Sequence, residues 1–171
     1  MNMNVYKVNE RATVPEYATK GSACFDVAPC ISNGDRLKSF NAFNKEMSII
    51  VKGVGAARDA FQLPPGIRVL VPTGLIFDIP AGHVMKMYIR SSQALKKGLK
   101  IANGVGIIDS DYVEESFMML ENVSDSMATV EHGERMAQCL IEKALRTKIV
   151  ETSDKPGQKT DRDGGFGSTG K

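Results

Sequence analysis

The sequence IRVLVPTGLIFDIPAG, residues 67–82, has the pattern of two short β-strands joined by a tight turn. Apolar side chains occupy every second position on each side of residues 72–74, and they are Ile67, Val69 and Val71, then Leu75, Phe77 and Ile79. Alternation of this period places one face of a strand against a core, and Pro and Gly favour the turns between strands. The stretch therefore predicts two half-buried strands.

The strand pattern continues towards the C-terminus. Alternating apolar positions recur at Met85, Met87 and Ile89, then at Ile101, Val105 and Ile107. Residues 117–120 and 136–141 are apolar enough to form two further buried strands. Short strands separated by Pro/Gly turns are typical of β-sandwiches and jelly-roll-like barrels. We therefore expect an all-β, jelly-roll-like barrel.

One segment has the pattern of a helix. Residues 91–97 contain good helix formers, and Gly98 suits the position just beyond a helix C-terminus. A serine at the start is a favoured N-cap. The sequence predicts one short helix over residues 91–97, capped by serine and ended by Gly98.

The chain divides into a domain and an appendage. We expect the barrel to occupy residues 1–150, with an insertion at about 33–60 that holds one extra strand, 47–51, between flexible polar stretches. Residues 151–171 are rich in Gly, Asp, Lys and Thr. That composition predicts a flexible C-terminal arm outside the core.

Composition narrows the function classes. The 171 residues are 42% hydrophobic and 25% charged, which is ordinary for one globular domain. A net charge of +2 gives no case for nucleic-acid binding. No apolar run approaches the roughly 20 residues of a membrane span. We expect neither a nucleic-acid partner nor a membrane.

Cysteine usage indicates the compartment. Cys24, Cys30 and Cys139 form no C-x-x-C pair and are odd in number. That favours a reducing, intracellular setting, so the expected location is the cytoplasm. Only His83 and His132 are available as imidazole ligands, which argues against a zinc site.

The last eight residues, GGFGSTGK, are unsuited to a core but suited to a ligand. Glycine permits close backbone approach, and amides, hydroxyls and cations bind phosphate oxygens. Phe166 offers a face on which a base can stack. The segment reads as a flap over a nucleotide, and the alternative is a Gly/Ser spacer. Residues 165–171 also fit G-x-x-x-x-G-K, but no following helix is predicted.

Two further segments carry groups suited to anions. Arg90, Ser91 and Ser92 stand at the start of the predicted helix, where free N–H groups favour anions. Arg135 and Gln138 open an apolar strand. Taken alone, the first segment is more simply interpreted as a helix cap beside a surface arginine, and the second as a solvated strand start.

Residues 103–112, NGVGIIDSDY, combine glycines with carboxylates. Glycines within an apolar alternation suggest a hairpin whose backbone approaches a ligand closely. Asn103 carries both a donor and an acceptor, which suits a pyrimidine edge. Asp109 and Asp111 would share one strand face and bind Mg²⁺ or act as a general base. The plainer interpretation is a polar turn that ends a strand.

Taken together, these segments resemble the five ordered motifs of the homotrimeric dUTPases, enzymes that hydrolyse deoxyuridine triphosphate. In chain order the counterparts are GSACFD at 21–26, RSSQALKKG at 90–98, GIIDSDY at 106–112, GERMAQ at 133–138 and GGFGSTG at 164–170. The third and fifth are specific, whereas the first and fourth are weak alone. Their order, spanning most of the chain, carries the resemblance.

The resemblance implies a jelly-roll-like β-barrel assembled as a homotrimer, with each active site shared between subunits and closed by a C-terminal arm. The implied reaction converts dUTP to dUMP and pyrophosphate with Mg²⁺ as cofactor. Asp109 would be the general base for a water that attacks the α-phosphorus. The triphosphate would hold most of the Mg²⁺ coordination, and Asp26 would contact the ion through water.

The resemblance also implies a set of substrate contacts. The phosphate-binding residues would be Arg90, Ser91, Ser92, Arg135, Gln138 and Arg162. Asn103, with the backbone around Gly106 and Ile108, would recognise uracil, and Tyr112 would pack beneath the deoxyribose. In the arm, Phe166 would stack on the base while Gly167, Ser168 and Thr169 complete the contacts.

The chain departs from the family pattern in places. Arg162 precedes Phe166 by four positions, where five is usual, and Val113-Glu114-Glu115 replaces a turn that normally contains glycine. The extra carboxylates predict an altered turn or interface. Two alternatives remain open: a dCTP deaminase of the same fold, or a dUTP-responsive module that binds another protein.

Overall fold

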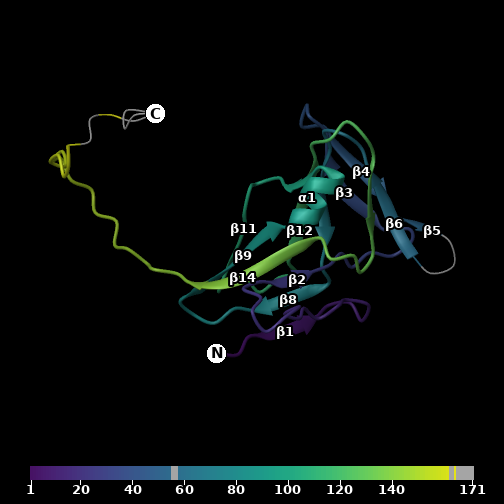
Figure 1. The fold of residues 1–171 in the computed structure, drawn as a ribbon, viewed down its shortest axis with the longest axis horizontal. Helices are drawn as coiled ribbons and strands as arrows, with labels where there is room; N and C mark the ends of the chain where they lie inside the picture. Colours follow the sequence, from purple (N-terminus) through teal and green to yellow (C-terminus); the bar gives the residue numbers. More distant parts are fainter. Residues whose placement is uncertain (55–57, 162–163, 165–171) are drawn as a thin grey trace.

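The computed structural model describes residues 1–54, 58–161 and 164. Within them the chain forms fourteen strands and one helix (Figure 1). In chain order these are β1 (Asn4–Lys7), β2 (Phe25–Val27), β3 (Arg36–Phe40), β4 (Glu46–Ile50), β5 (Lys52–Val54), β6 (Arg58–Leu63), β7 (Arg68–Pro72), β8 (Leu75–Asp78), β9 (His83–Ile89), α1 (Ser91–Lys97), β10 (Leu99–Ile101), β11 (Gly106–Asp109), β12 (Phe117–Asn122), β13 (Ala128–Glu131) and β14 (Ala137–Lys143). The expected all-β class with one short helix is confirmed.

Two antiparallel sheets form most of the body. One has the order β10-β12-β7-β3-β4 and the other β11-β9-β14-β2, while β13-β6-β5 and β1-β8 form smaller sheets. The predicted strands of residues 67–82 are β7 and β8, but they belong to different sheets. The chain changes sheet at Gly74, whose φ is +70° and whose absent Cβ would lie 2.8 Å from the Ala12 Cβ. Only glycine fits that crossing without a shift.

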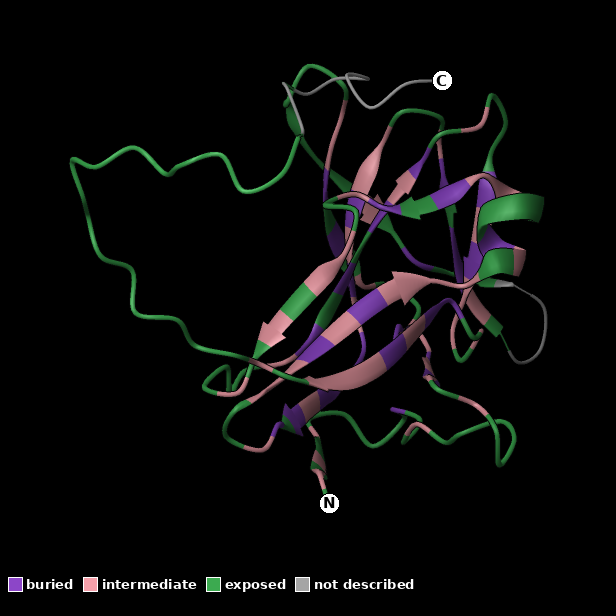
Figure 2. Cartoon of the chain, turned by 60° about the vertical axis from the view of Figure 1, so that its left-hand side comes forward, coloured by how far each residue is buried: buried purple, intermediate pink, exposed green. Residues whose placement is uncertain are grey.

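The core lies between the inward faces of these sheets. Side chains less than 2% exposed come from both large sheets, and they include Val69, Val71, Met85, Met87, Met118, Leu120 and Cys139. In strands such as β7 and β12, buried positions alternate with more exposed ones at the two-residue period of a strand, as Figure 2 shows along the body. The apolar alternation read from residues 67–89 is therefore the core-facing side of the sheets. The alternation predicted at Ile101, Val105 and Ile107 is wrong in β11, because Ile107 is 54% exposed and Ile108 is the residue that packs against the core.

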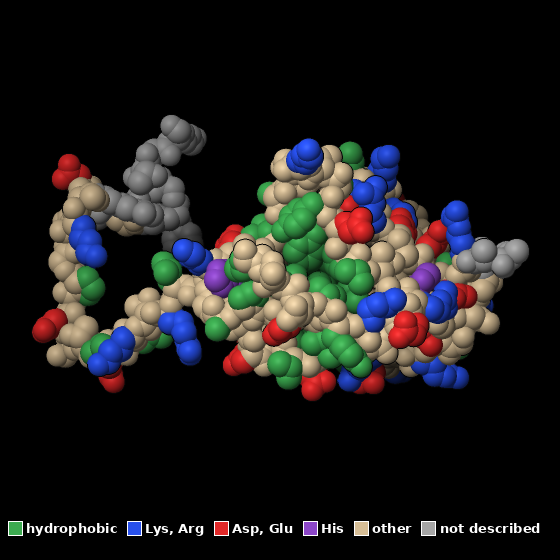
Figure 3. Space-filling model, turned by 90° about the horizontal axis from the view of Figure 1, so that it is seen from below, with side chains coloured by type: hydrophobic (Ala, Val, Ile, Leu, Met, Phe, Trp, Pro, Cys, Tyr) green, Lys and Arg blue, Asp and Glu red, His purple; other side chains and the backbone are tan. Residues whose placement is uncertain are grey.

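The side of the molecule that carries β1 and β8 is shown in Figure 3, where hydrophobic side chains gather in the middle of the body with charged ones around them. A hollow of about 350 Å³ beside β1 is lined mostly by apolar side chains, among them Met1, Met3, Val5, Tyr17 and Phe25. The four-residue strand β1 was not foreseen, because so short a segment shows little periodicity.

The predicted helix has the expected bounds but not the expected cap. Gly98 adopts a left-handed φ of 61° at the C-terminus, and its N–H bonds to the Ala94 and Gln93 carbonyls. At the other end the N-cap residue is Arg90, which makes no side-chain capping bond. The prediction of a serine cap is wrong, because Ser91 already lies inside the first turn.

The insertion is more ordered than the sequence indicated. The expected extra strand is β4, and β3 pairs with it over five residues and also with β7. The expectation of flexible polar stretches is wrong for residues 36–40, where Leu37 and Ser39 are buried. Only one of these two inward side chains is apolar, so the strand pattern was too weak to see. Residues 55–57 lie outside the described part.

Beyond β14 the described chain has no helix or strand. Residues 145–161 are exposed throughout and run away from the body (Figures 1 and 2). The division into residues 1–150 and a closing arm at 151–171 stays a prediction. Among the described residues, no helix combines the length and apolar character that crossing a membrane would take.

Candidate active site

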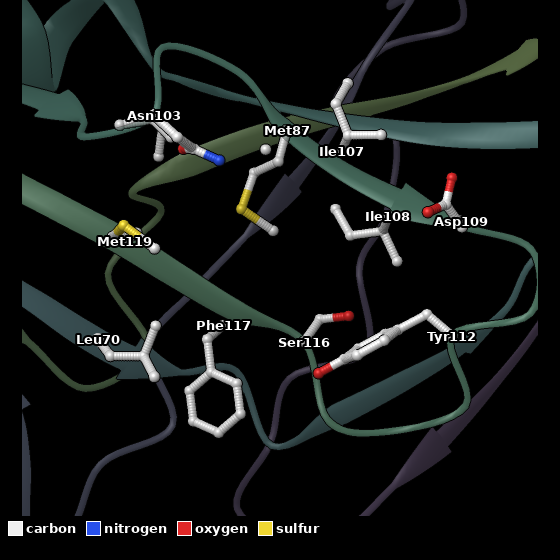
Figure 4. Close-up of a pocket in the computed structure, with 12 residues that line it drawn as sticks. Leu70, Met87, Asn103, Ile107, Ile108, Asp109, Tyr112, Ser116, Phe117 and Met119 are labelled. Carbon is white, nitrogen blue, oxygen red and sulfur yellow. The ribbon is translucent and has the colours of Figure 1, made fainter.

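A pocket of about 290 Å³ is lined by residues of both large sheets and of the loops that follow β10 and β11 (Figure 4). Asn103 lies at one end and Asp109 with Tyr112 at the other, with apolar side chains between them. Its lining is Leu70, Met87, Ile101, Asn103, Gly106, Ile107, Ile108, Asp109, Tyr112, Ser116, Phe117 and Met119. An apolar cavity with a few convergent polar groups is the usual form of a small-molecule site.

The glycine-containing segment reaches this pocket by crossing between sheets. β10 pairs with β12, whereas β11 pairs with β9, so the expected hairpin between these neighbouring strands is wrong. The turn is held by the N–H of Ala102, which donates to the Met119 carbonyl at 2.8 Å. At Gly106 an added Cβ would lie 3.1 Å from the Met87 Cβ. A side chain at that position would push into the pocket wall.

Asp109 is the last residue of β11, and Asp111 follows in the turn. The two carboxylates therefore do not share a strand face, which corrects that expectation. The strand ends because the chain turns back, with the Tyr112 N–H donating to the Asp109 carbonyl at 3.2 Å. Among the described residues, nothing forms a hydrogen bond or ion pair with the Asp109 carboxylate. The carboxylate is therefore available to accept a proton, or a hydrogen bond from a water molecule.

Glu115 positions the loop after Asp109, a role that sequence reasoning did not assign. Its Oε1 accepts the Gly74 N–H at 2.6 Å, and its carbonyl accepts the Tyr112 hydroxyl at 2.9 Å. The Glu115 side chain thus points inward and joins the loop to the β7–β8 crossing. The sequence pattern marked only an unusual turn here, because the partner glycine lies 41 positions earlier.

A second group of predicted residues meets at the start of α1. Asp26 on β2 accepts from two arginines, with Arg90 Nε at 2.9 Å and Arg135 Nη1 at 3.1 Å. Gln138 stands opposite Asp26 in the β14–β2 register, and Ser91 and Ser92 follow Arg90. A lone carboxylate between two arginines holds their guanidinium groups together, which prepares both to bind phosphate oxygens.

The two groups lie far apart in one chain. Asp109 pairs with Val84 near the start of β9, whereas Arg90 follows the end of that strand, six residues further on. At about 3.3 Å per residue, this separates the backbone of β9 beside Asp109 from the backbone of Arg90 by roughly 20 Å. The two groups of one chain therefore lie at opposite ends of β9. The predicted residues Arg162, Phe166, Gly167, Ser168 and Thr169 lie outside the described residues.

The predicted metal site rests on one carboxylate. Within residues 1–54, 58–161 and 164, no group of three or more His, Cys, Asp or Glu is placed to hold a metal ion. Asp26 is nevertheless a suitable partner for a hydrated Mg²⁺, because each of its oxygens has a further lone pair beyond the arginine bonds. Mg²⁺ often retains several waters and few protein ligands. The donor set fits an ion bound chiefly by a triphosphate.

Comparison with known protein families gives a match that covers two thirds of the chain. A family model described as dUTPase matches residues 56–170. A protein of Rhizobium leguminosarum bv. trifolii (strain WSM2304) is 43% identical over 161 residues, 94% of this chain and 87% of that protein. One of Hydrogenobaculum sp. (strain Y04AAS1) is 34% identical over 99% of each chain. Both are named deoxyuridine 5'-triphosphate nucleotidohydrolase.

Solved structures share the fold. The dUTPase of Streptococcus mutans has a TM-score of 0.61 at 24% identity, covering 87% of this chain and all of that one. The dUTPase of Staphylococcus bacteriophage 80alpha with dUPNHPP has a TM-score of 0.73 at 18% identity, over 99% and 98% of the two chains. A mutant dUTPase from phage phi11 of S. aureus, with a coordinated structural Mg(II) ion, has a TM-score of 0.67 at 17% identity, over 92% of this chain and 100% of that one.

Proposed function

Because this chain belongs to the dUTPase family, it hydrolyses dUTP to dUMP and pyrophosphate, and we propose that Asp109 is the general base of that reaction. The observation that carries the proposal is the position of its carboxylate. It stands at one end of the pocket without a partner among the described residues. There it accepts a proton from the water that attacks the α-phosphorus, a contribution of roughly 10²–10⁴-fold for such a group.

The pocket holds the nucleoside. Asn103 and the backbone at Gly106 and Ile108 recognise the uracil edge, and Tyr112 packs beneath the deoxyribose. Support comes from the tight wall at Gly106 and from the Tyr112 hydroxyl, which is already bonded to the Glu115 carbonyl. A narrow pocket of this kind rejects a 5-methyl group or a 2′-hydroxyl by steric exclusion, which discriminates better than apolar contact alone.

The residues that meet at the start of α1, here called the arginine group, bind the triphosphate. Arg90 and Arg135 bind phosphate oxygens together with Ser91, Ser92 and Gln138, and Asp26 would hold the magnesium ion through a water. Mg²⁺, when bound, neutralises charge on the phosphates. From the arm, Arg162, Phe166, Gly167, Ser168 and Thr169 complete the contacts to phosphate and base. Ordering of the arm would shield the site from bulk water while the attacking water stays bound.

We propose that the protein is a homotrimer in which each active site combines the pocket of one copy with the arginine group of a neighbour. The separation of roughly 20 Å within a chain supports this, because one substrate needs both groups. The outer face of the five-stranded sheet offers an apolar surface for a second copy, since Phe117 and Met119 are 38% and 42% exposed and also line the pocket.

A mass measurement in solution tests the assembly. Light scattering at micromolar concentration is expected to give three times the chain mass of 18.6 kDa. A monomer that hydrolyses dUTP at full rate would contradict the shared site, because its own two groups are too far apart.

We also propose a cytoplasmic location. The cysteines Cys24, Cys30 and Cys139 are all free thiols. Burial raises the pKa of the Cys30 thiol, so it is protonated and poorly reactive at neutral pH. Free cysteines are usual in a reducing compartment.

An assay with two nucleotides tests the function against the deaminase alternative. Purified protein with Mg²⁺ is expected to release pyrophosphate and dUMP from dUTP and to form no dUTP from dCTP. The names of the relatives favour hydrolysis, and Asp109 beside the pocket supplies a base for it. Accumulation of dUTP from dCTP, without pyrophosphate, would establish the deaminase instead.

A further inference from the structure

Gln93 is the one buried residue of α1 and is 7% exposed. Its neighbour on the helix, Leu95, is 86% exposed, so the helix turns a polar side chain inward and an apolar one outward. A buried amide destabilises a protein unless hydrogen bonds compensate for the lost water. The position is therefore occupied for its hydrogen bonds rather than for apolar packing.

The partners of Gln93 are both acceptors. Its Nε2 donates to the Glu134 Oε1 at 3.0 Å and to the Arg135 carbonyl at 3.2 Å. Neither bond is possible with the amide reversed, because an oxygen would then face two oxygens. The Gln93 Oε1 is left without a partner in the described structure. The two bonds from Nε2 therefore fix the orientation of the Gln93 amide.

Two further bonds converge on the same acceptors. Arg90 Nη1 donates to the Arg135 carbonyl at 3.1 Å, and Lys97 Nζ donates to the Glu134 Oε1 at 2.6 Å. Gln93 lies between these bonds and contacts both acceptors. The turn that carries Arg135 is consequently held against α1 by three side chains of the segment 90–97, with Gln93 at the centre.

We propose that Gln93 is a positioning residue that fixes Arg135 relative to Arg90 for binding the triphosphate. Both guanidinium groups already meet on Asp26, so a small displacement of the Arg135 turn separates them from each other. Gln93 is 7% exposed, so we assign it to positioning Arg135 and not to substrate contact. The inference rests on the proposed function, in which these arginines bind phosphate oxygens.

The variant Gln93→Leu tests this role, because leucine suits a buried position and lacks the amide group that makes the two hydrogen bonds. We expect it to weaken binding of the imido analogue of dUTP about tenfold. A change of that size corresponds to the loss of one charge-assisted hydrogen bond, here the bond between a displaced Arg135 and a phosphate oxygen. Inhibition by deoxyuridine, which lacks phosphates, should change less than about twofold. In steady-state kinetics KM should rise more than kcat falls.

Gln93→Glu is the second variant, with the same shape but a carboxylate directed at two acceptors. It should weaken the analogue further than leucine does, again with little change for deoxyuridine. Gln62→Leu is the matched control: Gln62 is exposed, and among the described residues its side chain bonds Thr129 Oγ1 alone, so both ligands should bind as in the wild type.

An equal loss for both ligands in either Gln93 variant would overturn the proposal, since it would show a general structural role. Unchanged binding of the analogue in both would overturn it too. Hydrolysis of dUTP by the wild type is scored separately, so failure of this inference leaves the proposed function standing.

Discussion

The variant Asp109→Asn is expected to lower kcat for dUTP by at least about a hundredfold while the imido analogue binds with nearly unchanged affinity. Asparagine keeps the shape of the side chain at the end of β11 but cannot take a proton from water. The substrate contacts of the pocket and the arginine group are untouched. Single-turnover hydrolysis and calorimetric titration of the analogue measure the two quantities separately.

Asp111→Asn is the matched control for this prediction. Asp111 lies two residues further along, in the turn, and does not line the pocket. Its kcat should stay within about tenfold of the wild type, well above that of Asp109→Asn. Near-normal turnover of Asp109→Asn would rule out the base assignment, and a hundredfold loss in Asp111→Asn alone would transfer the role to the other carboxylate.

Truncation before Asp161 should reduce kcat/KM by at least about a hundredfold while the melting temperature changes little. The catalytic loss follows from the proposed phosphate and base contacts of residues 162–169, because removing donors to developing charge typically costs 10²–10³-fold. The unchanged stability follows from the core, whose buried apolar residues in the described chain all lie between Ala12 and Cys139. Scanning calorimetry and initial rates test both parts.

A single substitution distinguishes the loss of the Arg162 side chain from the loss of the whole arm. Arg162→Ala should lower kcat/KM, whereas Lys159→Ala, at an exposed position three residues earlier, should not. A large fall in melting temperature on truncation would show that the tail is structural. Full activity of the truncated chain would remove the arm from the mechanism.

The parts of the fold that the sequence predicted are those with regular apolar alternation. The segments around Val69, Phe77 and Met87 and the helix ended by Gly98 were all identified. The strands β3, β6 and β13 were missed, because their inward positions include polar or small residues such as Ser39 and Ala128. Tertiary pairing, not local propensity, fixes such strands.

The site, too, was predictable from the sequence only in part. Motif resemblance selected Asp26, Arg90, Asp109 and Arg135, but the distance between the pocket and the arginines depends on strand register. Register is set by long-range pairing, which a single sequence does not reveal. Gln93 was missed as a separate site residue for a related reason. It bonds to residues more than 40 positions away, and nothing local distinguishes it from an exposed helix residue.

The placement of β9 determines how many active sites of the proposed trimer are affected by a defect in one chain. This strand pairs with β11 on one side and β14 on the other, so its two ends serve different catalytic centres in the proposed trimer. A copy with a distorted β9 would lose its own pocket and would also misplace the phosphate-binding arginines that it contributes to the active site of the neighbouring copy. One faulty chain among three would then silence two centres, and a mixed population would lose more activity than its share of defective molecules.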